Sequence, residues 1–296
     1  MNEIILLVGH GSRETDGNRE VEAFAAALRA RQPDWNVQTC FIEFAEPTLD
    51  EGLRRTAEQA ARVIVVPLIL NAAGHVKMEI PSFLDTARAR HPRTEFLYVP
   101  PLGASELLLA VLERRLAAAM RALDMPDPRT TGVILLGRGS SDRTANGELA
   151  KMARWLLEAG EHELVDIAFT GITHPRLERV VQRQARLGMM QIAILPYYHF
   201  TGSLIRRIER QVEHLKAQYP RLRFARGDYL GFEEEVFQLV EQRVREARSG
   251  RNATFMPCDG CKYRALAAAA CDRHHRHGEQ DCLLPVPSRE QETQAV

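Results

Sequence analysis

The sequence repeats itself with an offset of 128 residues, and this repetition constrains the fold more than any other feature. The apolar run that ends in Gly9-His10-Gly11-Ser12 returns as a run that ends in Gly137-Arg138-Gly139-Ser140. Further pairs share the same offset: Glu46-Pro47 with His174-Pro175, Gly74 with Gly202, His91-Pro92 with Tyr219-Pro220, and Leu102-Gly103 with Leu230-Gly231. The chain is therefore a tandem duplication of one unit of about 125 residues.

Each repeat opens with a short apolar run, and the first covers Ile4 to Val8. A run this short that stops at glycines is typical of a strand buried on both faces. His10 follows its carboxyl end, where open α/β sheets bind their ligands. A tight turn with a structural histidine is the alternative interpretation of this motif.

Strand-like and helix-like segments alternate through both repeats, which predicts parallel sheets joined by right-handed crossovers. The predicted fold class is α/β, with two tandem, doubly wound lobes and a short Cys/His-rich appendage. We expect one lobe over 1–124, a linker over 125–131, a second lobe over 132–248, and the appendage, partly disordered, over 249–296.

Charge and apolar patterning exclude several classes of partner. Lys and Arg together number 39, as do Asp and Glu, so no net field attracts nucleic acid or an anionic membrane. The apolar runs are too short for a membrane span or a signal peptide. Four of the five cysteines fall in the last forty residues, which favours a reduced, cytoplasmic setting over a disulfide framework.

Three side chains with metal-binding chemistry follow three predicted strands, namely His10, Glu43 and His75. Because parallel strands bring their carboxyl ends to one edge of the sheet, these groups should meet there. Two imidazoles and a carboxylate suit cobalt, nickel, iron or zinc, and neutral imidazole also accepts protons near pH 7. A solvated or helix-capping role for Glu43, and Glu46 as the carboxylate instead, remain open.

Three motifs give the chain a family resemblance: residues 7–13 (LVGHGSR), 41–47 (FIEFAEP) and 74–81 (GHVKMEIP). With them, the chain resembles the class II chelatases of the CbiX/SirB family in their long, two-repeat form. The resemblance implies a bilobal chelatase that inserts a divalent metal into the tetrapyrrole sirohydrochlorin without ATP. It also implies that His10 and His75 are catalytic and handle the metal, which is Co²⁺ or alternatively Fe²⁺ or Ni²⁺.

A tetrapyrrole that carries carboxylates needs cations in its site, and arginine grips carboxylates with a rigid fork. The predicted substrate-binding cations are Arg13 and Lys77 in the first repeat and Arg138, Arg206 and Arg207 in the second. The first lobe is then the metal-handling lobe, and the second holds the substrate. A solvated helix face is the alternative for each arginine, and the role of His199 is left open.

The last four cysteines, Cys258, Cys261, Cys271 and Cys282, form a separate candidate site. The Cys-x-x-Cys pair allows two thiolates to bind one centre. The surrounding sequence resembles the element that long CbiX proteins use for a [4Fe–4S] cluster, while structural zinc and free thiols are the alternatives. Cys40 falls in a predicted strand and is expected in the core.

Other functions fit the sequence less well or remain in competition. A histidine phosphatase requires arginine directly before its histidine, and Gly9 stands there. Insertion of iron for sirohaem synthesis is one alternative to cobalt chelation, and a non-catalytic metallochaperone or tetrapyrrole carrier is another. A carrier binds stoichiometrically, whereas a chelatase turns over.

Overall fold

The computed structural model describes residues 2–123 and 127–250, which form two parallel, four-stranded sheets with their helices. The first repeat contains β1 (Glu3–Gly9), α1 (Thr15–Arg31), β2 (Val37–Phe41), α2 (Leu49–Gln59), β3 (Arg62–Pro67), the π-helix η1 (His75–Glu79), α3 (Ile80–Arg90), β4 (Glu95–Tyr98) and α4 (Glu106–Arg121). The second contains β5 (Thr131–Gly137), α5 (Arg143–Ala159), β6 (Val165–Phe169), α6 (Leu177–Arg186), β7 (Gln191–Pro196), α7 (Ser203–Gln218), β8 (Arg223–Arg226) and α8 (Glu234–Arg248). The strand orders, β2-β1-β3-β4 and β6-β5-β7-β8, are equivalent, which confirms the predicted fold class.

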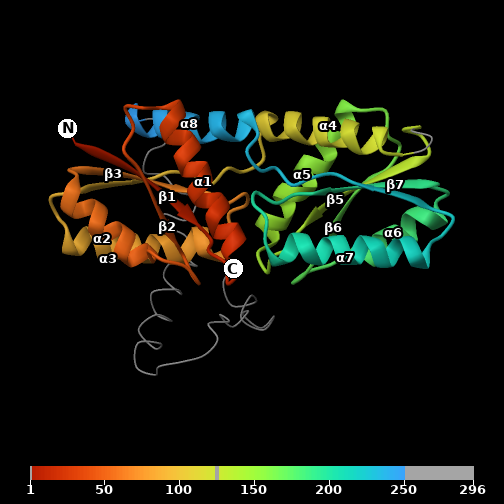
Figure 1. The fold of residues 1–296 in the computed structure, drawn as a ribbon, viewed down its shortest axis with the longest axis horizontal. Helices are drawn as coiled ribbons and strands as arrows, with labels where there is room; N and C mark the ends of the chain where they lie inside the picture. Colours follow the sequence, from red (N-terminus) through yellow and green to blue (C-terminus); the bar gives the residue numbers. More distant parts are fainter. Residues whose placement is uncertain (1, 124–126, 251–296) are drawn as a thin grey trace, which may run out of the picture. The chain divides into compact units, whose positions relative to one another are not determined.

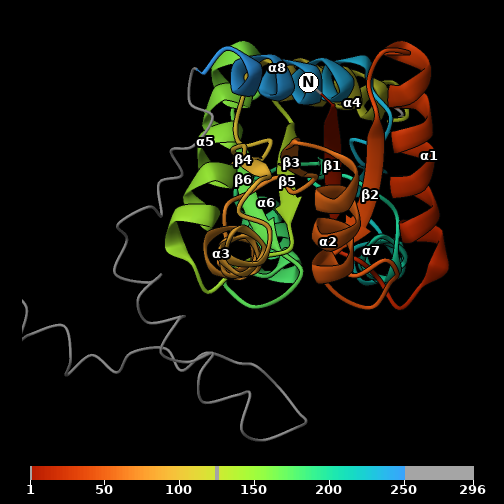
Figure 2. The same cartoon turned by 90° about the vertical axis from the view of Figure 1, so that its left-hand side faces the viewer.

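Both faces of each sheet are buried, as the unbroken apolar runs predict. Successive side chains of β1 point to opposite faces, and Ile4, Ile5, Leu6 and Leu7 are all at most 1% exposed. Ile5 and Leu7 share a core with Phe24 of α1, while Leu6 lies near α2 at Gly52. Figure 2 shows α2 and α3 on one side of the first sheet and α8 on the other.

The two repeats exchange their last helices, which differs from the domain boundaries predicted from the sequence. Helix α4 of the first repeat packs on β7 and β8, and α8 of the second repeat packs on β3 (Figure 1). One continuous core includes Ile64 and Val240 from the first sheet and α8, and Leu112 and Leu195 from α4 and the second sheet. The first lobe is therefore the sheet β1–β4 with α8, and the second is the sheet β5–β8 with α4.

The turn after the first strand has the same geometry in both repeats. In the first, Asn18 Oδ1 accepts from the Ser12 N–H at 2.9 Å, and Asn146 accepts from Ser140 at 2.9 Å in the second. Gly11 has a φ of +87°, and a Cβ there would lie 1.6 Å from the Glu43 carbonyl oxygen. Glycine is thus required where the β1 turn meets the loop that carries Glu43.

The helix after the third strand differs between the repeats. The bond from the Lys77 N–H to Ala73 O matches that from Arg206 to Gly202, so the local offset is 129 residues rather than 128. The stretch from Ala73 to His91 is one residue longer than the equivalent stretch from Gly202 to Tyr219. The first repeat forms the π-helix η1 in this stretch, whereas α7 of the second repeat is a continuous α-helix. A π-helical turn is how one inserted residue is accommodated in a helix.

The structure describes one of the five cysteines of the chain. Cys40 is a buried free thiol in the core, as predicted. Cys258, Cys261, Cys271 and Cys282 lie outside the described residues, together with most of the predicted appendage. Among the helices of residues 2–123 and 127–250, none combines the length and the apolar character that crossing a membrane requires.

Candidate active site

The first lobe brings His10, Glu43 and His75 together at the carboxyl edge of its sheet. One ligand atom from each lies within 4.8 Å of the others. His10 follows β1, Glu43 follows β2 and His75 opens η1 after β3, so the group lies where the order of the sheet reverses. This is the juxtaposition predicted from the sequence. The competing carboxylate, Glu46, instead accepts the Thr48 N–H at 3.0 Å.

The His10 ring is held from both sides. Its Nδ1 lies 3.1 Å from the Gly11 carbonyl oxygen and 3.3 Å from Glu43 Oε1, and its Nε2 lies 3.1 Å from Nη1 of Arg138. Burial, and then the neighbouring His75, lower the pKa of His10 to about 4. The imidazole is therefore neutral at pH 7, the form that binds a metal.

His75 has a carboxylate partner that sequence reasoning missed. Its Nδ1 lies 2.5 Å from Glu79 Oε2, and its ring meets that of His10 edge to face at a centroid distance of 4.6 Å. A carboxylate on one nitrogen fixes the ring and raises the basicity of the other nitrogen as a ligand. The four-residue spacing within one helix was the available signal.

The second lobe has no such ligand set. Arg138 and Gly171 occupy the places of His10 and Glu43, since Gly171 N–H bonds Arg138 O as Glu43 N–H bonds His10 O. With the offset of 129 residues, Leu204 is the residue of the second repeat that is equivalent to His75. No second group of three potential ligands occurs in the part of the chain that the structure describes.

The predicted substrate-binding cations divide into two kinds. Lys77 and Arg206 form ion pairs between the lobes, Lys77 with Asp142 at 2.5 Å and Arg206 with Glu14. These pairs are equivalent under the duplication, because each joins the helix after a third strand to the start of the other lobe's first helix. Lys77 and Arg206 thus bridge the lobes rather than facing solvent unpaired.

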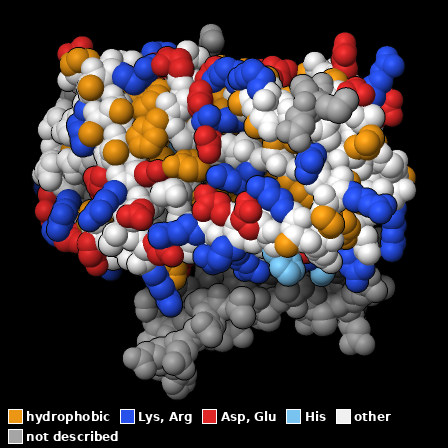
Figure 3. All heavy atoms as spheres, turned by 45° about the vertical axis from the view of Figure 1, so that its right-hand side comes forward, with side chains coloured by type: hydrophobic (Ala, Val, Ile, Leu, Met, Phe, Trp, Pro, Cys, Tyr) orange, Lys and Arg blue, Asp and Glu red, His pale blue; other side chains and the backbone are white. Residues whose placement is uncertain are grey.

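The other three cations, Arg13, Arg138 and Arg207, have no carboxylate partner within residues 2–123 and 127–250. Arg13 lies over the Phe44 ring, with its guanidinium carbon 4.8 Å from the centroid. Oppositely charged side chains alternate over the visible surface in Figure 3, so any attraction for anions is local to the site.

Two hydroxyl groups of the second lobe were also missed. Tyr198 and Thr170 share a hydrogen bond of 2.7 Å between their hydroxyl oxygens. Burial raises the pKa of Tyr198 to about 12, and nearby Arg138 and Arg207 partly oppose that shift. These two arginines therefore share one neutral hydroxyl neighbour. In the first lobe, the positions equivalent to Thr170 and Tyr198 hold the apolar residues Ile42 and Ile69.

Two apolar side chains project from equivalent loops beside the site. Phe44 is 52% exposed and Ile172 is 58% exposed, and both have a φ of +61°. A positive φ is strained for a β-branched residue, and such strain clusters at functional sites. Each lobe thus presents one large apolar surface next to the polar rim.

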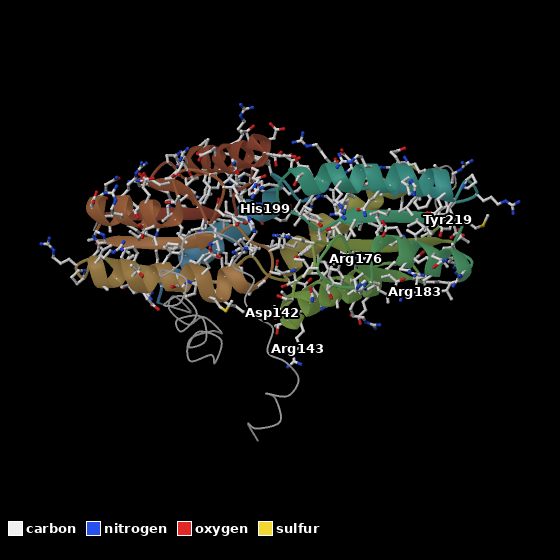
Figure 4. The ribbon with its side chains drawn as sticks, turned by 90° about the horizontal axis from the view of Figure 1, so that it is seen from below. Asp142, Arg143, Arg176, Arg183, His199 and Tyr219 are labelled. Atoms are coloured by element: carbon white, nitrogen blue, oxygen red, sulfur yellow. The ribbon has the colours of Figure 1, made fainter. Side chains whose placement is uncertain are left out.

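His199, whose role was open, lies at the junction of the lobes, as does Asp142, whereas Arg183 and Tyr219 lie at the far end of the second lobe (Figure 4). It stacks on Phe200 at a centroid distance of 3.8 Å. Neither ring nitrogen has a well-formed hydrogen bond to a described residue, although the Leu68 backbone lies nearby. Burial lowers the pKa of His199 to about 3, so it contributes to the junction as a neutral aromatic ring.

Comparison with known proteins shows the family of the chain. The sequence model of the CbiX family matches residues 4–119 and again residues 132–247. The chain is 37% identical over 276 residues to a sirohydrochlorin cobaltochelatase of Priestia megaterium, an alignment that covers 91% of this chain and 87% of the relative. It is 31% identical over 268 residues to a sirohydrochlorin ferrochelatase of Bacillus subtilis (strain 168), with 90% of this chain and 100% of the relative covered.

A solved structure shows the same fold. The sirohydrochlorin chelatase SirB from Bacillus subtilis subspecies spizizenii, in complex with cobalt, matches with a TM-score of 0.71 and 29% identity. The match covers 86% of this chain and 100% of that chain. Both repeats, and not the repeat with His10 and His75 alone, carry the likeness, and the chain belongs to the CbiX family of chelatases.

Proposed function

We propose that this protein inserts a divalent metal, foremost Co²⁺, into sirohydrochlorin without ATP. The observation that carries the proposal is the neutral His10 beside His75 and Glu43, at the edge of one lobe and facing an arginine of the other. Such a site can hold an ion that has lost part of its water shell and still leave it accessible to a second ligand.

The insertion replaces two pyrrole N–H bonds by bonds to the metal and releases two protons. Glu43 can accept one, because its Oε1 is near the His10 ring and its side chain is partly exposed. Glu79, which contacts His75 Nδ1, provides a second route, since its carboxylate is also partly exposed. Imidazole ligands release the ion as the four macrocycle nitrogens take it up.

The rim around the metal centre suits a flat polycarboxylate. Arg13, Arg138 and Arg207 are available to bind carboxylates, which they can grip with two parallel hydrogen bonds. Phe44 and Ile172 offer apolar surface to the faces of the macrocycle. The second lobe therefore contributes substrate contacts, while the first contributes the metal ligands.

The choice of metal is the finer part of the proposal. One relative is named for cobalt and another for iron, and the matched SirB structure holds cobalt. Nitrogen and oxygen ligands bind Fe²⁺, Co²⁺ and Ni²⁺ in the same rising order, so supply of the metal as well as affinity decides its use. We place the reaction in the cytoplasm, where a buried free thiol such as Cys40 and a tail rich in cysteine persist reduced.

The test is turnover in the absence of ATP. Purified protein is mixed without oxygen with a large excess of sirohydrochlorin and with Co²⁺, Fe²⁺ or Ni²⁺, and the absorbance of the metallated product is followed. We expect many equivalents of product per protein, with the highest kcat/KM for Co²⁺. Product limited to one equivalent would identify a carrier instead, and a preference for Fe²⁺ would assign the protein to sirohaem synthesis.

A further inference from the structure

Arg138 occupies the position from which a metal would meet His10. Its Nη1 lies 3.1 Å from His10 Nε2, and a guanidinium only donates hydrogen bonds. Nε2 must then be the accepting nitrogen, and Nδ1 carries the hydrogen beside the Gly11 carbonyl oxygen at 3.1 Å. The lone pair on Nε2 that accepts from Arg138 is the one that would bind a metal.

Nothing else in the described part of the chain holds Arg138 in this place. It is an exposed side chain without a carboxylate partner, whereas Lys77 and Arg206 on the same rim are both paired. The neutral hydroxyl of Tyr198 is close to it, but that hydroxyl shares its hydrogen bond with Thr170 instead. A carboxylate that approaches this rim would therefore be a stronger partner for Arg138 than the neutral imidazole.

We propose that Arg138 occupies the Nε2 lone pair of His10 until a tetrapyrrole carboxylate draws it away, so that substrate binding opens the metal site. The identity of the carboxylate ligand rests on the function proposed above. Arg138 acts here as a positioning residue, because it controls the availability of a metal ligand without binding the metal.

The proposal has a thermodynamic consequence. If the tetrapyrrole removes a competitor of the metal, it raises the affinity for the metal, and the metal must raise the affinity for the tetrapyrrole by the same factor. The ion is then held weakly by the empty protein and more tightly once its acceptor is present. Such coupling favours delivery of the ion to the macrocycle over its storage on the protein.

The decisive variants are Arg138→Met, which removes the charge and the hydrogen bond, and Arg138→Lys, which keeps the charge on a shorter reach. Co²⁺ binding is measured by calorimetry on the full-length protein without tetrapyrrole. Because a hydrogen bond of ordinary strength is lost, we expect Arg138→Met to bind Co²⁺ about tenfold tighter than the unmodified protein. The Co²⁺ affinity of Arg138→Lys should lie between those of Arg138→Met and the unmodified protein.

Arg143→Met is the matched control, since Arg143 is an exposed arginine of the same lobe that points outward in Figure 4. This variant should bind Co²⁺ as the unmodified protein does.

Equal affinity in Arg138→Met and the unmodified protein would overturn the proposal. So would a gain in Arg138→Met with none in Arg138→Lys, since that pattern indicates long-range charge repulsion rather than occupation of the lone pair. These measurements contain no tetrapyrrole, so they stand apart from the chelatase assay, whose failure would reject the proposed function alone.

A second measurement uses the unmodified protein. With histidine labelled by ¹⁵N, the Nε2 resonance of His10 is recorded before and after metal-free sirohydrochlorin is added. We expect a downfield shift, toward that of an imidazole nitrogen with no hydrogen-bond donor, as Arg138 leaves. An unmoved resonance at saturating tetrapyrrole would contradict the exchange of partners.

Discussion

The two lobes share a backbone and differ at one edge. Their strand orders are equivalent, and the Ser12 turn of the first lobe is reproduced by the Ser140 turn of the second. At the rim, however, His10, Glu43 and His75 of the first lobe are replaced by Arg138, Gly171 and Leu204 at the equivalent positions of the second. The duplicated core has thus kept its strand order, while the loops after the strands have changed their side chains.

The helix exchange explains why both copies are retained. Because α8 covers β3 and α4 covers β7 and β8, neither repeat buries its own sheet completely. The continuous core then ties the edge that carries His10, Glu43 and His75 in one lobe to the edge that carries Arg138 in the other. Two edges with different side chains are thus held together by one folding unit.

The largest effect should come from removing the ligands that only the first lobe has. We expect His10→Ala and His75→Ala each to reduce kcat/KM for cobalt insertion at least about a hundredfold, since even outer-shell partners of a metal are worth 10–100-fold. His214→Ala, on an exposed face of α7, is the control and should leave insertion unchanged. Circular dichroism should show an intact fold in all three. Near-normal turnover in either ligand variant would remove the metal centre from the first lobe.

The inserted residue of η1 is a second difference between the lobes, and deleting a residue there tests whether it matters for metal binding. Deleting Met78 should convert η1 into a continuous α-helix like α7 and rotate His75 relative to α3 by about one residue's turn. We expect Co²⁺ affinity to fall by at least about tenfold, an effect on the scale of losing an outer-shell partner. Thermal unfolding monitors the fold. Unchanged cobalt binding in a folded deletion variant would show that η1 has no part in aiming His75.

Glu43 and Glu46 compete for one role, and substitution separates them. Glu43→Gln should weaken Co²⁺ binding by about tenfold, within the range for a group that supports a metal site. Glu46→Gln should change it less than about twofold, because among the described residues Glu46 hydrogen-bonds the Thr48 N–H alone, at a helix start worth about 1 kcal/mol. Calorimetry compares both variants at one pH. A larger loss for Glu46→Gln would reverse the assignment.

The smallest effect should be that of the ion pairs between the lobes. Lys77→Met is expected to cost about 0.2–1 kcal/mol of unfolding free energy at pH 7, as partly exposed pairs do. Burial is the largest single influence and raises the pKa of Asp142, but the hydrogen bond and charge of Lys77 and the hydrogen bonds from the Thr144 and Ala145 N–H groups together outweigh it, so the folded pKa is lowered. The contribution is therefore present above the unfolded pKa of about 3.9 and is lost as pH falls through the lower folded value.

A double-mutant cycle with Asp142→Asn checks this, with denaturant unfolding recorded at neutral and acidic pH. A coupling energy that is unchanged down to pH 2 would show that the pair does not respond to Asp142 ionisation. A coupling energy well above 1 kcal/mol at neutral pH would show that the ion pair is stronger than the partial exposure of Lys77 and Asp142 suggests.

Sequence reasoning located the sheets and the meeting of His10, Glu43 and His75, because both depend on local pattern. The run before His10 and the run before His75 are strands by composition, and parallel pairing then brings their ends together without further information. The η1 turn was missed, because one inserted residue in a helix leaves no signal in the apolar pattern. Glu79 was missed although its four-residue spacing from His75 was a signal.

The helix exchange and the ion pair of Lys77 with Asp142 depend on how the lobes dock. Helices α4 and α8 are both amphipathic, and the two sheets offer them similar apolar faces, so the sequence does not distinguish the two partners. Lys77 and Arg206 therefore read as free cations in the sequence, although each has a carboxylate partner in the other lobe.

The position of bound cobalt tests the asymmetry of the lobes most directly. Crystals grown with Co²⁺ would be measured at the cobalt absorption edge, where anomalous scattering locates the ion independently of any model of the protein. We expect one ion bound by His10, Glu43 and His75, with bonds to the imidazole nitrogens of about 2.0–2.2 Å, and Arg138 displaced from His10. Cobalt held instead by the second lobe, or the first-lobe group left empty at saturating Co²⁺, would contradict the account.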